Sequence, residues 1–517
     1  MKRSLPDLCM NSILNQKGLA LMKVTTVLIL LMVLITPLLY SLPVLGAIRL
    51  QTTISSLGRP PADARFFPKS VIIDTNVSRI AYVVQKDTHF HIVEGDQIGP
   101  GFNAVGKDTP IFNPDGSRIA YTAKDGLRWY VVIDGRKSAG FDAVSVPVFS
   151  TEGSRVAFIG QEEDKQAVVV DGKKGTYYDG IVQKLNSPVF NRTADKMAYV
   201  ALKKKKMQLV VNGKAGPLYD AISPPKFSPD GSRLAYAAKE GDTWRIVLDG
   251  SPQAPFEATG VYGFSTDGSR FVYSVKTAEG CKMIEGSQHG PLFDGIGPPM
   301  FSHDSKRLAY MGLKNKKVTM VIDGTHGEFY GNVGYLSCSP DSKHVTYTAK
   351  DDEREFLVVD GKKTPVYEAV TVPIYSPDSQ HMLYTARTEG KWFTVRDGVK
   401  SAAFDMITIP QFSPDSQRVA YMAKRGEKWH LVVNGSEGKA YDGLAIPSFS
   451  PDSKHIACLA MKQGIWFVTV DDQEDDNWLV GGVKGAKLVW DASSKLHTLA
   501  IRGPGIEFIR MDVELVE

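Results

Sequence analysis

The sequence of 517 residues contains only four cysteines, and they do not form a disulfide framework. Cys9 precedes a long apolar run, whereas Cys281, Cys338 and Cys458 stand at positions that other copies of an internal repeat fill with aromatic residues. No cysteines are paired at the spacing of metal ligands. We therefore expect the last three to fill the core as free thiols.

An excess of charge of one sign is also missing. The chain has 61 lysines and arginines against 57 aspartates and glutamates, and four of the basic residues but only one acidic residue lie in residues 1–47. The remainder carries a formal charge of +1. Proteins that bind nucleic acid present a basic excess, so this balance argues against a nucleic-acid partner.

Sequence motifs of catalysis are absent as well. The chain has no Gly-x-Ser-x-Gly elbow, no His-Glu-x-x-His zinc helix and no phosphate-binding loop. Two local patterns leave alternatives: His89 and His91 alternate on one expected strand and could bind a metal, and the acidic run 471–476 could hold calcium or be a solvated loop. We expect no catalytic residue, no metal and no cofactor.

What the sequence does contain is a repeat of about 37 residues, typified by FSPDGSRLAYAAKEGDTWRIVLDG at 227–250. A repeat of this length indicates a solenoid or propeller. Degenerate copies near Ile73 and Trp490 bring the number of copies to twelve. The aromatic residue of the turn, or its replacement, stands at Phe112, Phe149, Phe190, Phe227, Phe264, Phe301, Cys338, Tyr375, Phe412 and Phe449.

Each copy predicts four short strands. The first ends in a Pro-Asp turn, the second is 233–239, the third is 244–250 and closes in Asp-Gly, and the fourth is an aromatic-acid segment such as 141–142. The second strand carries Leu234 and Tyr236 on one face and Ala235 on the other, so we expect both faces to be packed. Repeated four-stranded sheets buried on both faces are propeller blades.

The N-terminal region differs in composition. Residues 1–47 combine basic residues with an apolar run at 24–48, which predicts either a cleaved signal peptide, starting at Met1 or Met22, or an uncleaved membrane anchor. Both alternatives place the repeats outside the cytoplasm. Residues 48–66 are a linker with one possible strand, which could complete the last blade and close the ring.

Several residue types recur at fixed repeat positions. Asp142, Asp179 and their counterparts in the fourth strand are expected to hold blades together, and Trp129 and its counterparts to pack between blades. His344, His381 and His455 stand where other copies have arginine, so we interpret them as turn residues. Basic residues at the end of the second strand form a candidate lysine face that could attract an acidic partner or merely keep the hairpins soluble: Lys124, Lys239, Lys276, Lys350, Arg387 and Lys424.

The motif at 225–236, with a variant at 410–421, resembles the repeat of TolB-type, WD-repeat-like β-propellers. The resemblance covers nearly everything from residue 66 onward. It implies a periplasmic protein that binds proteins and peptides through the faces and channel of the ring. The chain departs from TolB in having no obvious preceding α/β domain and about twice the blades. Similar blades also accompany hydrolase domains in dipeptidyl-peptidase families.

The sequence therefore predicts an all-β propeller of about twelve four-stranded blades. Two arrangements are open: two six-bladed rings, at 67–298 and 299–517, or one wide ring. The missing linker near residue 298 favours one ring, whereas the six blades of TolB lead us to favour two slightly. The expected function is non-enzymatic binding of a protein or peptide at the cell envelope; the alternatives are a polysaccharide lyase or hydrolase and a carbohydrate-binding protein.

Overall fold

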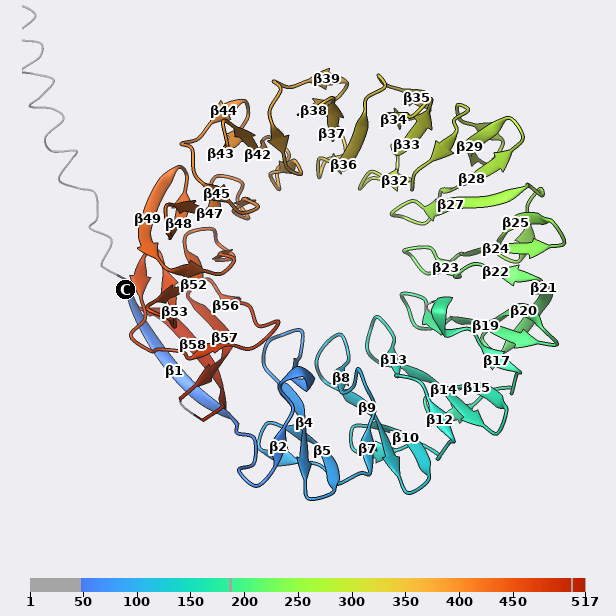
Figure 1. Cartoon of the computed structure of the whole chain (residues 1–517), viewed down its shortest axis with the longest axis horizontal. Helices are drawn as coiled ribbons and strands as arrows, with labels where there is room; N and C mark the ends of the chain where they lie inside the picture. The colour runs from blue at the N-terminus through green and yellow to red at the C-terminus, as the bar shows by residue number, and fades with distance from the viewer. Residues whose placement is uncertain (1–47, 186–187, 504, 517) are drawn as a thin grey trace, which may run out of the picture. The chain divides into compact units, whose positions relative to one another are not determined.

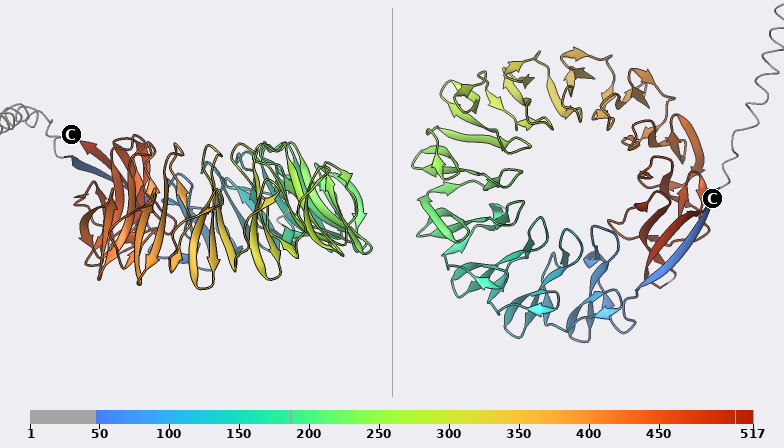
Figure 2. Two further views of the ribbon diagram at one scale, coloured as in Figure 1. Left: turned by 90° about the horizontal axis from the view of Figure 1, so that it is seen from above. Right: turned by 180° about the vertical axis from the view of Figure 1, so that it is seen from behind.

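The computed structural model describes residues 48–185, 188–503 and 505–516, and the fold is that of the compact unit Leu50–Glu514. This unit is a β-propeller of twelve small antiparallel sheets arranged in a single ring (Figures 1 and 2). The predicted all-β fold and the number of blades are confirmed. The predicted signal or anchor at 1–47 lies outside the described residues. Within the described ranges, no helix is long and apolar enough to cross a membrane.

Blade 5 shows how one repeat folds. Its first strand comes in two pieces, β22 (Ala221–Ile222) and β23 (Lys226–Phe227), which both pair with β24 (Leu234–Glu240). The sheet continues through β25 (Thr243–Leu248) to β26 (Ser251–Pro252). In Figure 1, first-strand pieces such as β23 and β32 (Met300–Phe301) lie on the inner side of the ring, and fourth strands such as β35 (Thr325–His326) and β44 (Val399–Lys400) lie on the outer side.

The other blades follow this plan, except that the first strand is continuous in blades 6 and 8. Two 3₁₀ turns, η1 (Pro68–Ser70) and η2 (Gln183–Leu185), are inserted in blades 1 and 4. Blades 1 to 4 are β2 (Arg65–Phe66) to β6 (Gln97–Ile98), β7 (Ala104–Val105) to β11 (Arg136–Lys137), β12 (Ala143–Val144) to β16 (Lys173–Lys174), and β17 (Gly180–Ile181) to β21 (Lys214–Tyr219). Blades 6 to 11 are β27 (Ala258–Phe264) to β30 (Gln288–His289), β31 (Gly295–Ile296) to β35 (Thr325–His326), β36 (Asn332–Cys338) to β39 (Lys362–Lys363), β40 (Ala369–Val370) to β44 (Val399–Lys400), β45 (Met406–Ile407) to β49 (Ser436–Tyr441), and β50 (Gly443–Leu444) to β54 (Gln473–Glu474). Blade 12 consists of β55 (Gly481–Gly482), β56 (Val489–Ala492), β57 (Lys495–Arg502), β58 (Glu507–Val516) and β1 (Arg49–Gly58).

The predicted fourth strand was placed too late in the chain, because the fourth strand of blade 2 is β11 and only the aromatic residue of the predicted segment 141–142 joins the sheet. Phe141 bridges Trp129 at the outer edge of blade 2. The backbone N–H of Asp142, the next residue, donates to the carbonyl of Gln161 in blade 3 at 2.9 Å. The chain therefore crosses from one blade to the next between these two residues, and the acid belongs to the crossing.

Packing between blades sets a large side chain against small ones. Tyr236 of blade 5 is buried against Ala198 and Leu209 of blade 4. On the opposite face of the same strand, Ala235 is buried in a cluster with Phe271 of blade 6. The expectation that both faces are packed is confirmed, and the core of the ring is this succession of interfaces.

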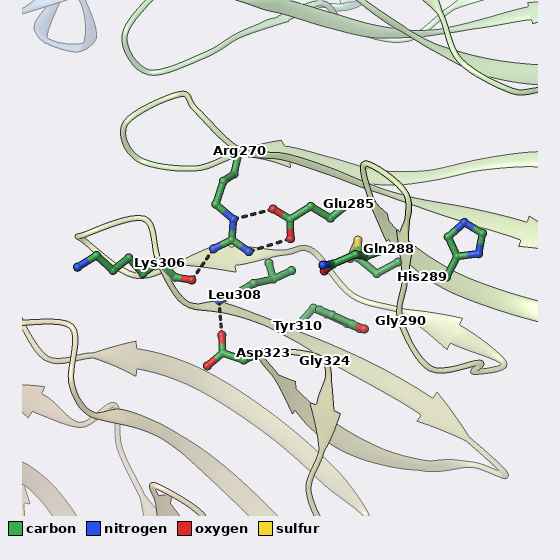
Figure 3. Close-up of a pocket in the computed structure, with 11 residues that line it drawn as sticks. Arg270, Glu285, Gln288, His289, Gly290, Lys306, Leu308, Tyr310, Asp323 and Gly324 are labelled. Atoms are coloured by element: carbon green, nitrogen blue, oxygen red, sulfur yellow. Dashed lines mark hydrogen bonds and ion pairs between the residues drawn. The ribbon is translucent and has the colours of Figure 1, made fainter.

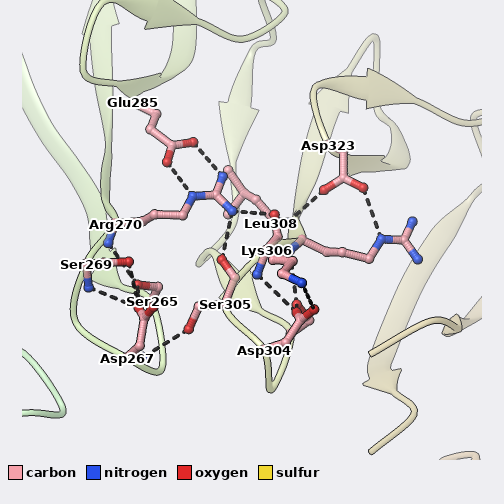
Figure 4. A network of polar contacts seen from close by, with 12 residues as sticks. Ser265, Asp267, Ser269, Arg270, Glu285, Asp304, Ser305, Lys306, Leu308 and Asp323 are labelled. Carbon is pink, nitrogen blue, oxygen red and sulfur yellow. Dashed lines mark hydrogen bonds and ion pairs between the residues drawn. The ribbon is translucent and has the colours of Figure 1, made fainter. Parts of the chain in front are cut away.

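At several borders an arginine links one blade to the next on one face of the ring, whereas lysine or histidine stands at the equivalent position in blades 4, 8, 9 and 11. Arg270 of blade 6 donates to Glu285 of its own blade at 2.6 and 2.8 Å (Figure 4). It also donates to the carbonyl of Ser305 in blade 7 at 2.9 Å and lies 5.0 Å from the ring centre of Phe301 in that blade. The same contact to the next turn aromatic is made by Arg79, Arg118, Arg155, Arg233 and Arg418.

The border between blades 6 and 7 is packed like the others, so the slight preference for two rings was wrong. Val272 and Met283 of blade 6 share one buried cluster with Leu308 and Tyr310 of blade 7. The arginine contact described above also crosses this border. The chain has no linker there because the repeat interface simply continues.

The ring is closed by the strand that the sequence indicated near its N-terminal end. β1 pairs with β58 as the last strand of blade 12. Blades 12 and 1 then share a buried cluster that includes Phe508, Leu499, Tyr82 and Ile80. Closure leaves β58 without a free edge.

We expect Arg270→Ala to lower the free energy of unfolding by about 2 kcal/mol, because it removes charge-assisted hydrogen bonds and a cation-π contact between two blades. The measurement is the midpoint of urea denaturation. Arg192→Ala at an exposed position is the control and should leave the midpoint unchanged. Equal midpoints for the two variants would contradict the role of Arg270.

Removal of residues 50–58 should expose the backbone of β58 as an open edge, and open edges pair with other chains. We expect the shortened protein to form dimers and larger assemblies in size-exclusion chromatography with light scattering at a concentration at which the intact chain does not. A monomeric, equally stable product would show that β1 is not needed for closure.

The turn carboxylates make stability depend on acid pH. Hydrogen bonds from the side chains of Ser228 and Ser232 lower the pKa of Asp230 from 3.8 to about 2, and hydrogen bonds from serine likewise lower the pKa of Asp304 and Asp378. A pKa depressed in the folded state contributes stability that is complete above the unfolded value and is lost as pH falls through the folded value. We expect the thermal midpoint to decline between pH 4 and pH 2, and less steeply in Asp230→Asn.

Candidate binding surfaces

The residues of the predicted lysine face occupy one equivalent position in six different blades. Each is the sixth residue of a second strand: β9 (Ile119–Asp125), β24, β28 (Phe271–Thr277), β37 (Val345–Asp351), β42 (Met382–Thr388) and β47 (Val419–Arg425). They are Lys124, Lys239, Lys276, Lys350, Arg387 and Lys424. The structure therefore spreads them around the ring, one per blade, and does not gather them into one cluster.

Contacts within the same blade reduce the positive charge that the lysine face presents to solvent. Lys124, Lys239, Arg387 and Lys424 each stand opposite a tryptophan on the third strand. Arg387 also forms an ion pair with Glu368 at 3.3 Å and lies 5.6 Å from the ring centre of Trp392. Lys276 is exposed, whereas the other five are half-buried. Their role as a docking surface stays a prediction.

The recurring acid has the structural role that was expected. Asp142 accepts one hydrogen bond from Arg128 of blade 2 at 2.6 Å and another from the backbone N–H of Glu163 in blade 3 at 2.7 Å. Asp442 likewise accepts from Lys428 and from the N–H of Gln463. One carboxylate thus joins the third strand of one blade to the hairpin of the next.

Histidine and cysteine are also used for structure. His344, His381 and His455 each bond an aspartate of their own blade at 2.7 Å, in the place of the arginine, which confirms the interpretation as turn residues. Cys458 is fully buried, and burial raises the pKa of its thiol to about 12. Such a thiol is unreactive at neutral pH.

Two of the alternatives for metal binding do not assemble a site. His91 bonds the carbonyl of Gly99 at 2.9 Å, and no third ligand lies with it and His89 in the described part of the chain. In the acidic run, Asp475 is buried and bonded to Thr52, and Glu474 forms ion pairs with Lys462 and Lys439. The interpretation of that run as a solvated loop was therefore wrong, because its acids hold blades 10 to 12 together.

One group of possible ligands does come together at the ring closure. Asp491, His497 and Asp512 of blade 12 point potential ligand atoms at one another. Both ring nitrogens of His497 are already used, with Asp491 at 2.7 Å and with the carbonyl of Asn76 at 2.8 Å. Arg510 lies 2.8 Å from Asp512 and 3.7 Å from Asp491. The positive guanidinium therefore occupies the place of a cation.

The inner side of blades 1 to 4 carries three adjoining hollows that the sequence did not reveal. The first, of about 640 Å³, lies between blades 1 and 2, the second, of about 530 Å³, extends to blade 3, and the third, of about 470 Å³, reaches blade 4. Ile72, Pro110 and Ile111 line both the first and the second, and Val148 and Phe149 line both the second and the third. Together they form one channel-side surface, which we call the inner groove.

The inner groove is mainly apolar, with charge at one end. Val146 and Val148 are each 39% exposed, and Phe67 forms part of the wall between blades 1 and 2. Lys69 and Lys107 are exposed beside that wall. Apolar lining with a few polar groups is typical of binding sites.

The sequence carries a signal for the break in the first strand, although not for the position of the groove in blades 1 to 4. The residue before the proline at this break is apolar and exposed in several blades, as at Val146, Ile409 and Ile446, which are 39%, 72% and 80% exposed. The sequence predicts a first strand Pro-x-Phe-Ser that begins at this proline, whereas the structure has a further strand piece before it. The repeated pair of an apolar residue and proline marks this interruption and the exposed apolar side chain beside it.

No protein-family model matches the chain, and no curated protein matches it. Among solved structures, TolB from Acinetobacter baumannii is similar at 14% identity over 57% of this chain and 80% of that chain, with a TM-score of 0.23. The Dos1 propeller is similar at 12% identity over 62% and 90%, with a TM-score of 0.25. The dihydro-heme d1 dehydrogenase NirN is similar at 13% identity over 61% and 77%, with a TM-score of 0.29. These similarities concern the fold alone, and the propeller fold agrees with the resemblance that the repeat indicated.

Proposed function

We propose that the chain is an exported, non-enzymatic propeller of the cell envelope that binds an extended segment of a partner protein in the inner groove. The observation that carries the proposal is the continuity of three apolar hollows over four consecutive blades. A continuous groove suits a chain molecule better than a single small ligand, since successive side chains can enter successive hollows.

The chemistry of the groove supports an apolar segment with an acidic end. Phe67, Phe112 and Phe149 contribute aromatic walls, and Pro110 adds to the apolar lining. Lys69 and Lys107 at the blade 1 end outnumber the neighbouring Asp108. We infer that the partner segment is extended, presents apolar residues toward blades 2 to 4, and carries a carboxylate toward these lysines.

Non-enzymatic binding is supported by how the nucleophiles and bases are used. Over the described ranges, no histidine ring bonds a serine or a cysteine, and the bond of Thr88 to His89, at 3.2 Å, lies on an exposed hairpin. The repeated carboxylates are held by arginine, lysine and backbone N–H groups. Export is supported by the apolar composition of residues 24–48.

The proposal is tested with the full-length chain carrying a photocrosslinking residue at position 148, expressed in its native envelope. The crosslinked segment of the partner is identified by mass spectrometry and synthesised, and its affinity for the purified chain is measured. We expect Val146→Asp with Val148→Asp to weaken binding at least tenfold, because each change places a charge against an apolar segment. Leu127→Asp is the matched control, since Leu127 is 89% exposed on a hairpin outside the groove.

A second variant separates the groove from the lysine face. In this variant Lys124, Lys239, Lys350 and Lys424 become Glu, and the same affinity is measured. Loss of binding here with full binding by the double aspartate variant would move the site to the lysine face. Binding in the groove is refuted if position 148 crosslinks to no protein. It is also refuted if the double variant with Val146→Asp and Val148→Asp binds the partner segment with the same affinity as the Leu127→Asp control.

A further inference from the structure

A separate pocket of about 240 Å³ lies between blades 6 and 7, away from the inner groove (Figure 3). Its walls come from β29 (Gly280–Glu285) and β30 of blade 6 and from β33 (Leu308–Lys314) of blade 7. Met283 and Leu308 supply an apolar surface. The volume is below the range of about 300 to 1,000 Å³ usual for drug-sized ligands, so the pocket admits one small molecule.

The strongly charged groups of this pocket already have partners. Arg270 is held by Glu285 at 2.6 and 2.8 Å and by the carbonyl of Ser305. Asp323 accepts the N–H of Leu308 at 2.9 Å and a bond from Arg307 at 3.0 Å. Because these charges cancel in pairs, the pocket does not select a strongly charged ligand.

The hydroxyl of Tyr310 is the polar group left over. Tyr310 is 2% exposed, and its buried hydroxyl has no hydrogen-bond partner in the part of the chain that the structure describes. Burial raises the pKa of Tyr310 to about 12, so the hydroxyl stays protonated and can both donate and accept. A buried hydroxyl without a partner is unfavourable by about 1–3 kcal/mol.

The repeat explains why this hydroxyl is free. In blades 4 and 5 the equivalent Tyr199 and Tyr236 have hydrogen-bond partners in Tyr178 and Tyr219 of the preceding blade. At the border of blades 6 and 7 the preceding aromatic residue is Phe293, which has no hydroxyl.

A glycine keeps the space beside this hydroxyl open. A Cβ added to Gly290 would lie 2.4 Å from the Tyr310 hydroxyl oxygen, so any larger residue at this position would fill the pocket. Between blades 9 and 10, by contrast, Tyr421 also has an unpartnered hydroxyl, but Ser401 lines that pocket.

We propose that this pocket binds one small, uncharged, polyhydroxylated molecule of the size of a single sugar ring. The Tyr310 hydroxyl bonds a ligand hydroxyl at the base of the pocket, and Met283 and Leu308 contact the apolar face of the ring. Gln288 and His289, both exposed at the mouth, bond the remaining hydroxyls. The site is independent of the inner groove.

The test uses saturation-transfer NMR on the full-length chain with D-glucose, D-galactose, D-mannose and N-acetyl-D-glucosamine as probes. We expect at least one sugar to bind, Tyr310→Phe to weaken it about tenfold, which corresponds to one lost hydrogen bond, and Gly290→Ala to abolish binding. Tyr273→Phe makes the same change in the second strand of blade 6 and should leave the affinity unchanged.

A stability measurement separates this site from a structural role of the hydroxyl. Because Tyr310→Phe removes an unpartnered polar group, its thermal midpoint without sugar should equal or exceed that of the unmodified chain. A lower midpoint would reveal a structural partner and overturn the proposal. Binding by none of the four sugars, or equal affinity in Gly290→Ala, would also overturn it.

Discussion

The arginine contact between consecutive blades is the interaction on which the ring depends. The guanidinium of Arg270 or Arg233 is fixed by an acid in the hairpin of its own blade, and its other end reaches a carbonyl of the next blade. Its flat face covers the turn aromatic of that blade. One side chain therefore sets both the distance and the rotation between two sheets, which apolar packing alone leaves adjustable.

The histidines in place of this arginine keep its bond to the acid, whereas Lys196 in blade 4 keeps the reach and donates to the carbonyl of Ser232 in the next blade at 2.7 Å. His344 bonds Asp360 and stacks on Tyr375 of the next blade with 15° between the rings. His381 bonds Asp397 and stacks on Phe412 in the same way. An imidazole is too short to reach the next carbonyl. These blades still have the serine link, in which Ser379 and Ser416 accept the N–H of Asp341 and Asp378 across the border, and the same link also occurs at borders that have the arginine.

The turn itself exists in two forms that the sequence distinguishes as Pro-Asp-Gly and Pro-Asp-Ser. Gly116 and Gly268 have φ of 74° and 77°, and a Cβ there would lie within 2.6 Å of a carboxylate of the preceding turn. Ser342 and Ser416 adopt the same left-handed conformation, with φ of 64° and 68°, and use their hydroxyls for the bond across the border. The strain of a left-handed serine is offset by a hydrogen bond that glycine cannot make.

Local features of the chain could be predicted from the sequence, whereas the number of blades per ring could not. The period, the strands at 234–240 and 243–248 and the closing strand at 49–58 follow from patterns of neighbouring residues. Whether six or twelve blades close a ring depends on a small rotation between sheets that is repeated at every border. Border residues such as Arg270, Met283 and Leu308 would be of the same types in a ring of either size, so their identity in the sequence does not give the rotation. The break in the first strand was not predicted, because a proline such as Pro147 or Pro410 is typical of the first residue of a strand and so indicates a start rather than an interruption.

The two proposed sites lie where the residues of the repeat leave apolar surface or a polar group without a partner. A position that recurs in every blade, such as Asp142 or Arg118, is already used to hold two sheets together. The inner groove arises at blades 1 to 4, where η1, η2 and the exposed pair Lys107 and Asp108 alter the inner loops. The pocket at Tyr310 lies at a border where the preceding aromatic residue is Phe293, one of several phenylalanines at this repeat position, so that residue offers Tyr310 no hydroxyl. Where the repeat satisfies its own polar groups, no group is left for a ligand, and the two proposed sites are places where apolar surface or a hydroxyl remains.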